Sequence, residues 1–227
     1  ATKLKIRQLF RNSEFKLYLW LVLGFTAFIM VELIIRNHYE LEKAFRVAIF
    51  QVVSFITTTG LYSDDAAKWP HVTWVVLAAC MFFGGSSGST SGGIKSIRGV
   101  MLVKIVKNEF RQILHPNAVL PMKIDGYNVQ MSKRVTLLAF IGLYLFLAVI
   151  CAFTMIAAGI DSTNSMTITL SCLGNVGPTL GLEIGPTMSW NELPDFAKWI
   201  SSFLMLVGRL ELFSVLVLFT PSFWKEN

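Results

Sequence analysis

Two short polar stretches that carry glycine constrain the fold of this chain more than any other feature of its sequence. They cover residues 56–61 and 174–178. Each one ends an apolar, helix-like run that is too short to cross a bilayer, and each lies between two runs long enough to cross one. Because the bilayer core has no water to satisfy free backbone groups, such a stretch is tolerated there only where protein buries it or where it lines a water-filled path.

The composition indicates a membrane protein. Of the 227 residues 54% are apolar and 15% are charged, and the mean hydropathy is +0.58. These values are far from those of a soluble domain and predict an integral membrane protein with several spans. The three histidines are scattered without metal-ligand spacing, and the sequence reveals no pairing of a nucleophile with a base. We therefore expect neither a transition-metal site nor an enzyme.

The net charge of +6 is distributed in a way that argues against nucleic acid as a partner. Lys and Arg concentrate in residues 3–16 and 95–134, whereas residues 159–195 carry four acidic residues and no basic one. Basic segments stay on the cytoplasmic side of a membrane. We therefore expect residues 1–16 and about 96–133 inside, so that the N-terminal segment of this chain is cytoplasmic. This basic inner surface also suits the anionic headgroups of a lipid bilayer.

The chain divides into two units with the same order of elements. In the first unit, residues 1–115, we expect spans at about 17–35 and 71–114. Between them a short apolar helix over 41–56 ends at the first polar loop, residues 57–61.

The second unit, residues 116–227, repeats this plan. We expect spans at about 134–158 and 196–219, with a short helix at about 163–173 between them. Asp161 can cap that short helix, which ends at the second polar stretch. A short helix of this length suits a re-entrant segment. Each unit returns to the side from which it started, so the predicted fold is an all-α integral membrane protein with two parallel span–re-entrant helix–loop–span repeats.

The two loops have the chemistry of an ion filter. A cation that leaves water must recover a shell of oxygen ligands, and backbone carbonyls turned into a pore supply one in potassium channels. Glycine helps because it adopts backbone conformations closed to other residues, and the negative C-terminal end of each short helix favours a cation. The candidate ligands are Thr57, Thr58, Thr59, Gly60, Asn175, Val176 and Gly177. The alternative is that both loops are ordinary glycine helix caps, but the same placement in both repeats favours a filter.

A run of small residues over 84–93 interrupts the inner half of a predicted span. A phosphate-binding loop is disfavoured because Ile94 stands where that motif needs lysine, and Lys95 comes one residue late. Two interpretations stay open, namely close helix packing through small residues and a flexible intramembrane loop that gates the pore. The candidate gate residues are Gly84, Gly85, Gly88, Gly92, Gly93, Lys95 and Arg209.

Three further charged residues have candidate roles. Arg209 lies in an apolar run, where a guanidinium is costly and normally faces the protein interior or a water-filled cavity. We expect it to face the conduction path and raise a barrier to cations; the alternative is a structural pairing with a carboxylate. Glu211 is close in sequence, but residues two apart on a helix do not face each other. Asp64 and Asp65 either concentrate cations outside the first loop or form a solvated turn.

Several of these features occur together as motifs. They are Thr57-Thr58-Thr59-Gly60, the run 84–95, His115-Pro116-Asn117, Asn175-Val176-Gly177-Pro178 and Gly208-Arg209-Leu210-Glu211. Spread over nearly the whole chain, they resemble those of the TrkH and KtrB superfamily of potassium transporters, most closely the TrkH type. That superfamily has four span–loop–span repeats, and this chain resembles the third and fourth, its C-terminal half. The resemblance implies one filter glycine per repeat and selectivity for potassium, with passage of sodium.

The resemblance also implies surroundings and partners. It places the chain in a bacterial inner (cytoplasmic) membrane, as part of a full-length homodimer. It implies that Arg209 contacts the gate loop, and that a cytoplasmic ring of nucleotide-binding regulatory subunits docks on inner surfaces such as 96–133. Potassium is the transported ligand, and no cofactor is implied. Because half a pore does not conduct, we expect a missing N-terminal half or a second copy to complete it.

The sequence thus predicts potassium uptake through a backbone-carbonyl filter gated by an intramembrane loop. Two alternatives stay open. One is a sodium-permissive or ion-coupled symporter of the same fold, and the other is a non-conducting membrane interaction subunit whose loops only pack. A membrane-embedded hydrolase would need a convergent nucleophile and base, which the sequence does not reveal.

Overall fold

A computed structural model describes residues 12–118, 120–180, 190–210 and 212–224. In this part of the chain the α-helices are α2 Ser13–Asn37, α3 Leu41–Ile56, α4 His71–Phe82, α5 Ser96–Leu114, α6 Met131–Ala157, α7 Ser162–Gly174, α8 Asp195–Arg209 and α9 Leu212–Val217. Short 3-10 helices lie at η1 Ala66–Lys68, η2 Trp190–Glu192 and η3 Pro221–Phe223. Two strands, β1 Lys123–Ile124 and β2 Tyr127–Asn128, pair antiparallel in the connection between α5 and α6.

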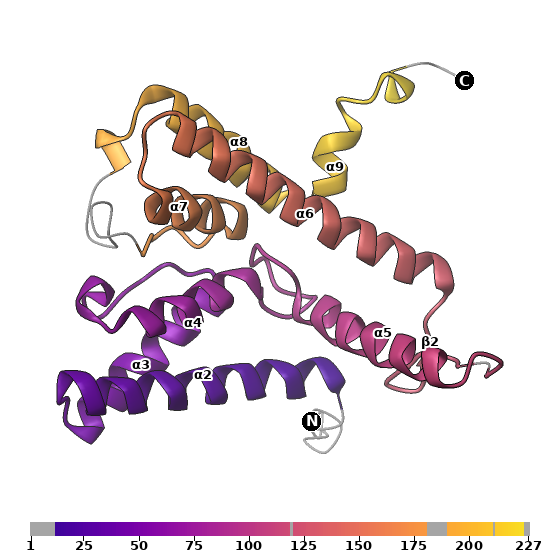
Figure 1. Ribbon diagram of the computed structural model, residues 1–227, viewed down its shortest axis with the longest axis horizontal. Coiled ribbons are helices and arrows are strands. Elements are labelled where there is room, and N and C mark those ends of the chain that lie inside the picture. The colour runs from indigo at the N-terminus through magenta and orange to yellow at the C-terminus, as the bar shows by residue number, and fades with distance from the viewer. Residues whose placement is uncertain (1–11, 119, 181–189, 211, 225–227) are drawn as a thin grey trace, which may run out of the picture.

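The helices form two layers, one from each half of the chain (Figure 1). In the first layer α2 packs against α3, and in the second α7 packs against α6 and α8. The layers meet where α4 contacts α7 and where α5 contacts α6. Each half of the chain has a hydrophobic core that also contains side chains from the other half. Val176 and Leu180 lie in the core of the first half, and Ile94 lies in the core of the second half.

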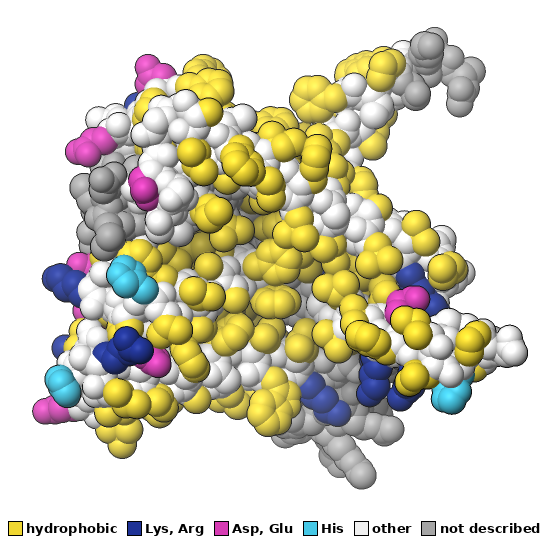
Figure 2. Space-filling model, in the orientation of Figure 1, with side chains coloured by type: hydrophobic (Ala, Val, Ile, Leu, Met, Phe, Trp, Pro, Cys, Tyr) yellow, Lys and Arg dark blue, Asp and Glu magenta, His cyan; other side chains and the backbone are white. Residues whose placement is uncertain are grey.

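Two of the described helices, α2 and α6, are long and apolar enough to cross a membrane. A core helix of a soluble protein would be mostly buried, but only 22% of the apolar window of α2 and 33% of that of α6 are buried. Large apolar side chains face outward instead, as Trp20 on α2 (74% exposed) and Phe153 on α6 (66% exposed) do. Figure 2 shows hydrophobic side chains across the middle of this face, with charged side chains gathered toward its ends.

The two short helices pack against the longer ones, α3 against α2 and α7 against α6. At about 1.5 Å per residue, α3 with 16 residues and α7 with 13 residues are shorter than a bilayer core of about 30 Å. Asp161 caps α7 as the sequence predicted, since its carboxylate accepts hydrogen bonds from the amides of Thr163 (2.9 Å) and Asn164 (3.4 Å). Beyond the capped end, α7 is buried over most of its length, polar residues included.

The structure differs from the sequence-based expectation in two elements. We expected one continuous helix over about 196–219, but α8 ends at Arg209 and α9 turns away from its axis (Figure 1). The break follows Gly208, whose backbone lies against the carbonyl oxygen of Leu173. The connection between α5 and α6 also contains a short hairpin that the sequence did not predict, with Asp125 and Gly126 at its turn, at φ of 50° and 91°.

Candidate functional site

The two predicted loops, one from each half of the chain, lie directly against each other. A Cβ placed on Gly60 would collide with the carbonyl oxygen of Val176 and come within 3.2 Å of Pro178 Cδ. The two loops also line one cavity of about 280 Å³. Its lining residues are Thr58, Thr59, Ser171, Cys172, Asn175, Val176, Gly177, Trp190 and Met205. None of these carries a formal charge at neutral pH, so the lining of the cavity is uncharged.

The backbone of the two loops repeats one conformational pattern. In the first loop φ is positive at Thr58 (55°) and at Gly60 (73°), and in the second at Asn175 (54°) and at Gly177 (108°). A positive φ is a genuine outlier for a β-branched residue such as threonine. The same alternation therefore occurs twice, at the glycine and two residues before it, and at Thr58 it needs support from surrounding contacts.

The first loop folds back onto the last turn of α3. The amide of Thr59 donates to the carbonyl of Ser54 at 2.9 Å, and the Ser54 hydroxyl donates to the carbonyl of Leu61 at 2.5 Å. The hydroxyls of Thr57 and Thr59 share a hydrogen bond of 2.8 Å. In a trans peptide the N–H and the C=O point in opposite directions. Since the Thr59 amide points at α3, the carbonyl of Thr58 points away from that helix.

The second loop folds back onto α7 in the same way. The amide of Val176 donates to the Ser171 carbonyl at 3.0 Å, and the amide of Gly177 donates to the Ser171 hydroxyl at 3.1 Å. By the same peptide geometry the carbonyls of Asn175 and Val176 point away from α7. The Val176 carbonyl is the group that lies against Gly60, so it points toward the first loop.

The electrostatic field at the loops favours a cation. Both α3 and α7 direct their C-terminal ends, which carry a partial negative charge, at the loops, and neither has a basic residue in its last turn. Among the described residues no group of three or more His, Cys, Asp or Glu could hold a metal ion. The oxygens offered at this site are therefore backbone carbonyls and hydroxyls, which suit a weakly bound, hard cation.

The glycine-rich run 84–93 forms a loop closed at its neck. The amide of Gly84 donates to the Ile94 carbonyl at 2.6 Å, and the amide of Ile94 donates to the Phe82 carbonyl at 3.0 Å. The Ser96 hydroxyl donates to the Gly84 carbonyl at 2.9 Å. These bonds hold the two ends of the run together between α4 and α5.

This loop touches both predicted filter loops. The amide of Gly92 donates to the Thr58 hydroxyl at 3.3 Å. A Cβ on Gly92 would collide with the carbonyl oxygen of Gly174, at the end of α7, and lie 3.0 Å from Asn175 Cβ. The structure thus brings the predicted gate loop into contact with the ends of both short helices.

The five predicted gate glycines differ in their surroundings. Gly84 and Gly85 are buried, and Gly93 has a φ of 69°. By contrast, Gly88 lies at the exposed tip, where a Cβ would meet nothing within 4 Å. The tip is held by Lys95, whose Nζ donates to the carbonyls of Ser89 (2.5 Å) and Ser91 (2.9 Å).

Arg209 lies beside this loop, at the end of α8. Its Nη1 donates to the carbonyl of Thr90 at 2.7 Å. Arg209, Lys95 and the loop tip line a second cavity of about 230 Å³. Glu211, which belongs to the same sequence motif, lies outside the described residues.

Sequence reasoning missed the residues that hold the loops. Ser54 and Ser171 each lie six residues before a filter glycine, and that repeated spacing was a detectable signal. Glu14, at the start of α2, accepts hydrogen bonds from the Ser87 amide (2.5 Å) and hydroxyl (3.0 Å) of the gate loop. No pattern in the sequence links Glu14 with Ser87, because the two residues are 73 positions apart.

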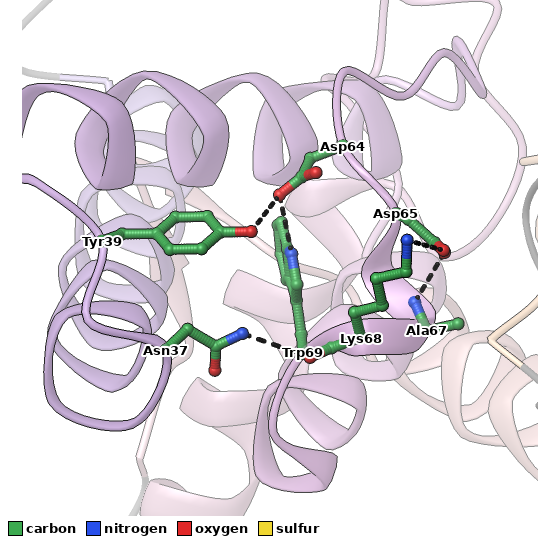
Figure 3. Close-up of polar contacts among 7 residues, drawn as sticks. All are labelled: Asn37, Tyr39, Asp64, Asp65, Ala67, Lys68 and Trp69. Atoms are coloured by element: carbon green, nitrogen blue, oxygen red, sulfur yellow. Dashed lines mark hydrogen bonds and ion pairs between the residues drawn. The ribbon is translucent and has the colours of Figure 1, made fainter.

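Asp64 and Asp65 lie just after the first loop and accept hydrogen bonds from neighbouring residues (Figure 3). Asp64 Oδ2 accepts hydrogen bonds from the Tyr39 hydroxyl (2.9 Å) and from Trp69 Nε1 (3.2 Å), and Asp65 accepts one from the Ala67 amide (3.1 Å). Burial raises the pKa of Tyr39, and its hydrogen bond to Asp64 raises it further. Both carboxylates thus have protein partners, while the two roles expected for them, concentrating cations or forming a solvated turn, stay predictions.

Comparison with known proteins points to one family. The family model TrkH, described as "Cation transport protein", matches residues 3–226. The potassium uptake protein TrkH of the Trk system from Halomonas elongata is 33% identical over 222 residues, which are 98% of this chain and 45% of that protein. The TrkH protein of Escherichia coli K12 is 35% identical over 219 residues, 95% of this chain and 44% of its own length.

A solved structure is similar as well. The crystal structure of the potassium transporter TrkH from Vibrio parahaemolyticus matches with a TM-score of 0.88 at 32% identity, over 95% of this chain and 46% of that one. The chain thus spans about half the length of the curated relatives it matches.

Proposed function

This chain belongs to the TrkH family of cation transport proteins and corresponds to its C-terminal half, and from that premise we propose that it forms two quarters of a potassium-conducting pore. Each quarter consists of a span, a re-entrant helix, a filter loop and a second span. The repeats are residues 1–115 and 116–227, and the re-entrant helices are α3 and α7. The relatives are named potassium uptake proteins, which supports potassium as the ion carried.

The orientation of the loop carbonyls is the observation that carries this proposal. The amides of Thr59, Val176 and Gly177 are bonded back to the short helices, so the carbonyls of the preceding residues point away from those helices. A dehydrating potassium ion needs such oxygens, and fixed carbonyls replace its water shell without rearranging. No covalent bond is made or broken, so the protein acts as a transporter and not as an enzyme.

The proposed gate is the loop 84–93 together with Arg209. The loop lies against both filter loops through Gly92, and the guanidinium of Arg209 bonds its Thr90 carbonyl. In the closed state the loop blocks the path below the filter, and the fixed positive charge repels cations. Opening requires the loop to leave Thr58 and Gly174, which breaks few and weak contacts.

The complete pore needs two more quarters. We assign them to an N-terminal half of the same protomer, with a second copy of this half as the alternative. The assembled protein is a homodimer that spans the bacterial inner membrane several times, with the N-terminal segment of this chain in the cytoplasm. A cytoplasmic nucleotide-binding ring docks on the basic surface over about 96–133.

Ion uptake by the full-length protein in proteoliposomes tests this function. Gly177→Ala should lower potassium uptake at least about tenfold, because a positive φ costs a residue with a Cβ about 1–3 kcal/mol and rotates a filter carbonyl. Gly142→Ala is the matched control, since both glycines have open space around them but Gly142 lies within α6. Equal uptake by the two variants would contradict the filter assignment.

A sodium-permissive or coupled symporter is the second candidate. The uncharged lining of the cavity between the loops supports this candidate, because no charged side chain there distinguishes potassium from sodium. Parallel uptake of potassium, rubidium and sodium, with and without an imposed proton or sodium gradient, separates the two functions. Uptake that follows the imposed gradient of the second ion identifies the symporter.

A further inference from the structure

Two buried serines occupy equivalent positions in the two repeats. Ser54 lies six residues before Gly60, and Ser171 lies six residues before Gly177. Ser54 is 4% exposed and Ser171 is fully buried. In each repeat the serine carbonyl accepts the amide of the residue just before the glycine, at 2.9 Å and 3.0 Å. The two halves of the chain therefore build the same anchor from unrelated surrounding sequence.

The hydroxyl groups of these two serines form hydrogen bonds with residues that follow them in the chain, which is unusual within a helix. Serine and threonine within membrane helices ordinarily bond back to the carbonyl three or four residues earlier. Thr57 does so with Val53, and Thr167 does so with Thr163. Ser171, by contrast, accepts a hydrogen bond from a residue ahead of it in the loop.

The Ser54 hydroxyl also reaches forward, but with the opposite polarity. It donates to the carbonyl of Leu61, directly after Gly60, and thereby turns that carbonyl toward α3. Ser171 instead accepts from the amide of Gly177, and thereby turns the carbonyl of Val176 away from α7. Ser54 thus turns the Leu61 carbonyl away from the space between the loops, whereas Ser171 leaves the Val176 carbonyl pointing into it.

We propose that Ser54 and Ser171 are positioning residues that set how well the pore distinguishes potassium from sodium. Ser171 fixes the rotation of the peptide plane between Val176 and Gly177. Ser54 fixes the plane between Leu61 and Tyr62, one residue beyond Gly60. The fixed spacing of carbonyls is what separates ions of different radius. Neither hydroxyl touches the ion. This inference rests on the proposed function, because it assumes that the loops conduct cations.

The ratio of potassium to sodium uptake, measured on the full-length protein in proteoliposomes, tests the inference. Ser54→Ala and Ser171→Ala should each lower this ratio by about three- to tenfold, the effect of losing one net hydrogen bond. Ser165→Ala is the matched control, because Ser165 is a fully buried serine of the same helix α7. Its hydroxyl bonds the Ile160 carbonyl at 3.3 Å, at the end far from the loop, so its ratio should equal that of the unchanged protein.

Substitution by cysteine guards against a cavity at the site, since cysteine keeps the shape of serine with a slightly larger atom but hydrogen-bonds weakly. Ser54→Cys and Ser171→Cys should lower the ratio as the alanine variants do. An unchanged ratio in either cysteine variant, alongside an altered ratio in Gly177→Ala, would overturn the inference and leave the proposed function intact. If the unchanged protein takes up neither ion, the proposed function itself is wrong.

Discussion

Gly88 and Gly92 lie four residues apart in one loop yet have opposite surroundings. A Cβ on Gly92 would strike the Gly174 carbonyl, whereas one on Gly88 would meet only open space. We expect Gly92→Ala to destabilise the protein by about 1–3 kcal/mol, the usual cost of overpacking, and to push the loop off the filter. Gly88→Ala should leave stability within about 0.5 kcal/mol of the original. Thermal unfolding in detergent measures both, and equal melting temperatures would show that this contact is not tight.

Arg209 supplies a second prediction about a single residue. Its guanidinium holds the gate loop through Thr90 and places a positive charge beside it. Arg209→Gln should raise potassium uptake about fivefold, the rate equivalent of roughly 1 kcal/mol. Arg36→Gln serves as the control, because Arg36 pairs with Glu32 at 2.8 Å on the exposed end of α2. Uptake that is unchanged or lower in a folded Arg209→Gln protein argues against an electrostatic barrier.

Among the elements, α7 depends most on a single cap. The Asp161 carboxylate satisfies two amides at its first turn, and α7 carries the second filter loop at its other end. Asp161→Ala should cost about 1 kcal/mol, and Asp161→Asn, which keeps a capping oxygen, should cost much less. Unfolding in increasing denaturant measures the difference. An equal loss in both variants would mean that the charge of Asp161, and not its hydrogen bonds, supports the helix.

The sequence predicted elements well where local chemistry decides them. Asp161 caps the first turn of α7, as predicted. The end of α8 at Arg209 was not predictable, because the contact between Gly208 and Leu173 depends on how two helices pack. The loops were identified by their polarity within apolar sequence, but their anchors, Ser54 and Ser171, were not. A single serine within a helix carries no strong local signal, and only the equal spacing of the two serines from the loop glycines could have marked them.

In the molecule as a whole, the two halves are held together by shared hydrophobic cores as well as by the covalent connection. Leu180, which follows the second filter loop, is 1% exposed in the core of the first half, and Ile94 is 1% exposed in the core of the second. If the chain is cut in the connection between α5 and α6 and both pieces are expressed together, we expect them to purify as one complex. The pieces should stay together because each half contributes side chains to the hydrophobic core of the other.

Two variants sharpen this expectation. Leu180→Ala should weaken the complex by about 2–5 kcal/mol, the range for buried leucine truncations. Leu145→Ala, at a side chain 48% exposed on α6, should leave it intact. Separate elution of the unmodified pieces would show that the covalent connection, and not the shared core, keeps the halves together.

If the loop 84–93 is the gate, as we propose, its closed neck has a consequence for the time course of gating. Bonds between Gly84 and Ile94 and between Ser96 and Gly84 hold the ends of the loop fixed, so its tip can rearrange without unwinding α4 or α5. Segments of this length reorganise in about 10–100 ns, whereas collective helix motions take microseconds to milliseconds. The loop will therefore follow the helices almost instantaneously, and the dwell times of single open and closed events will report the motion of the helices that carry it.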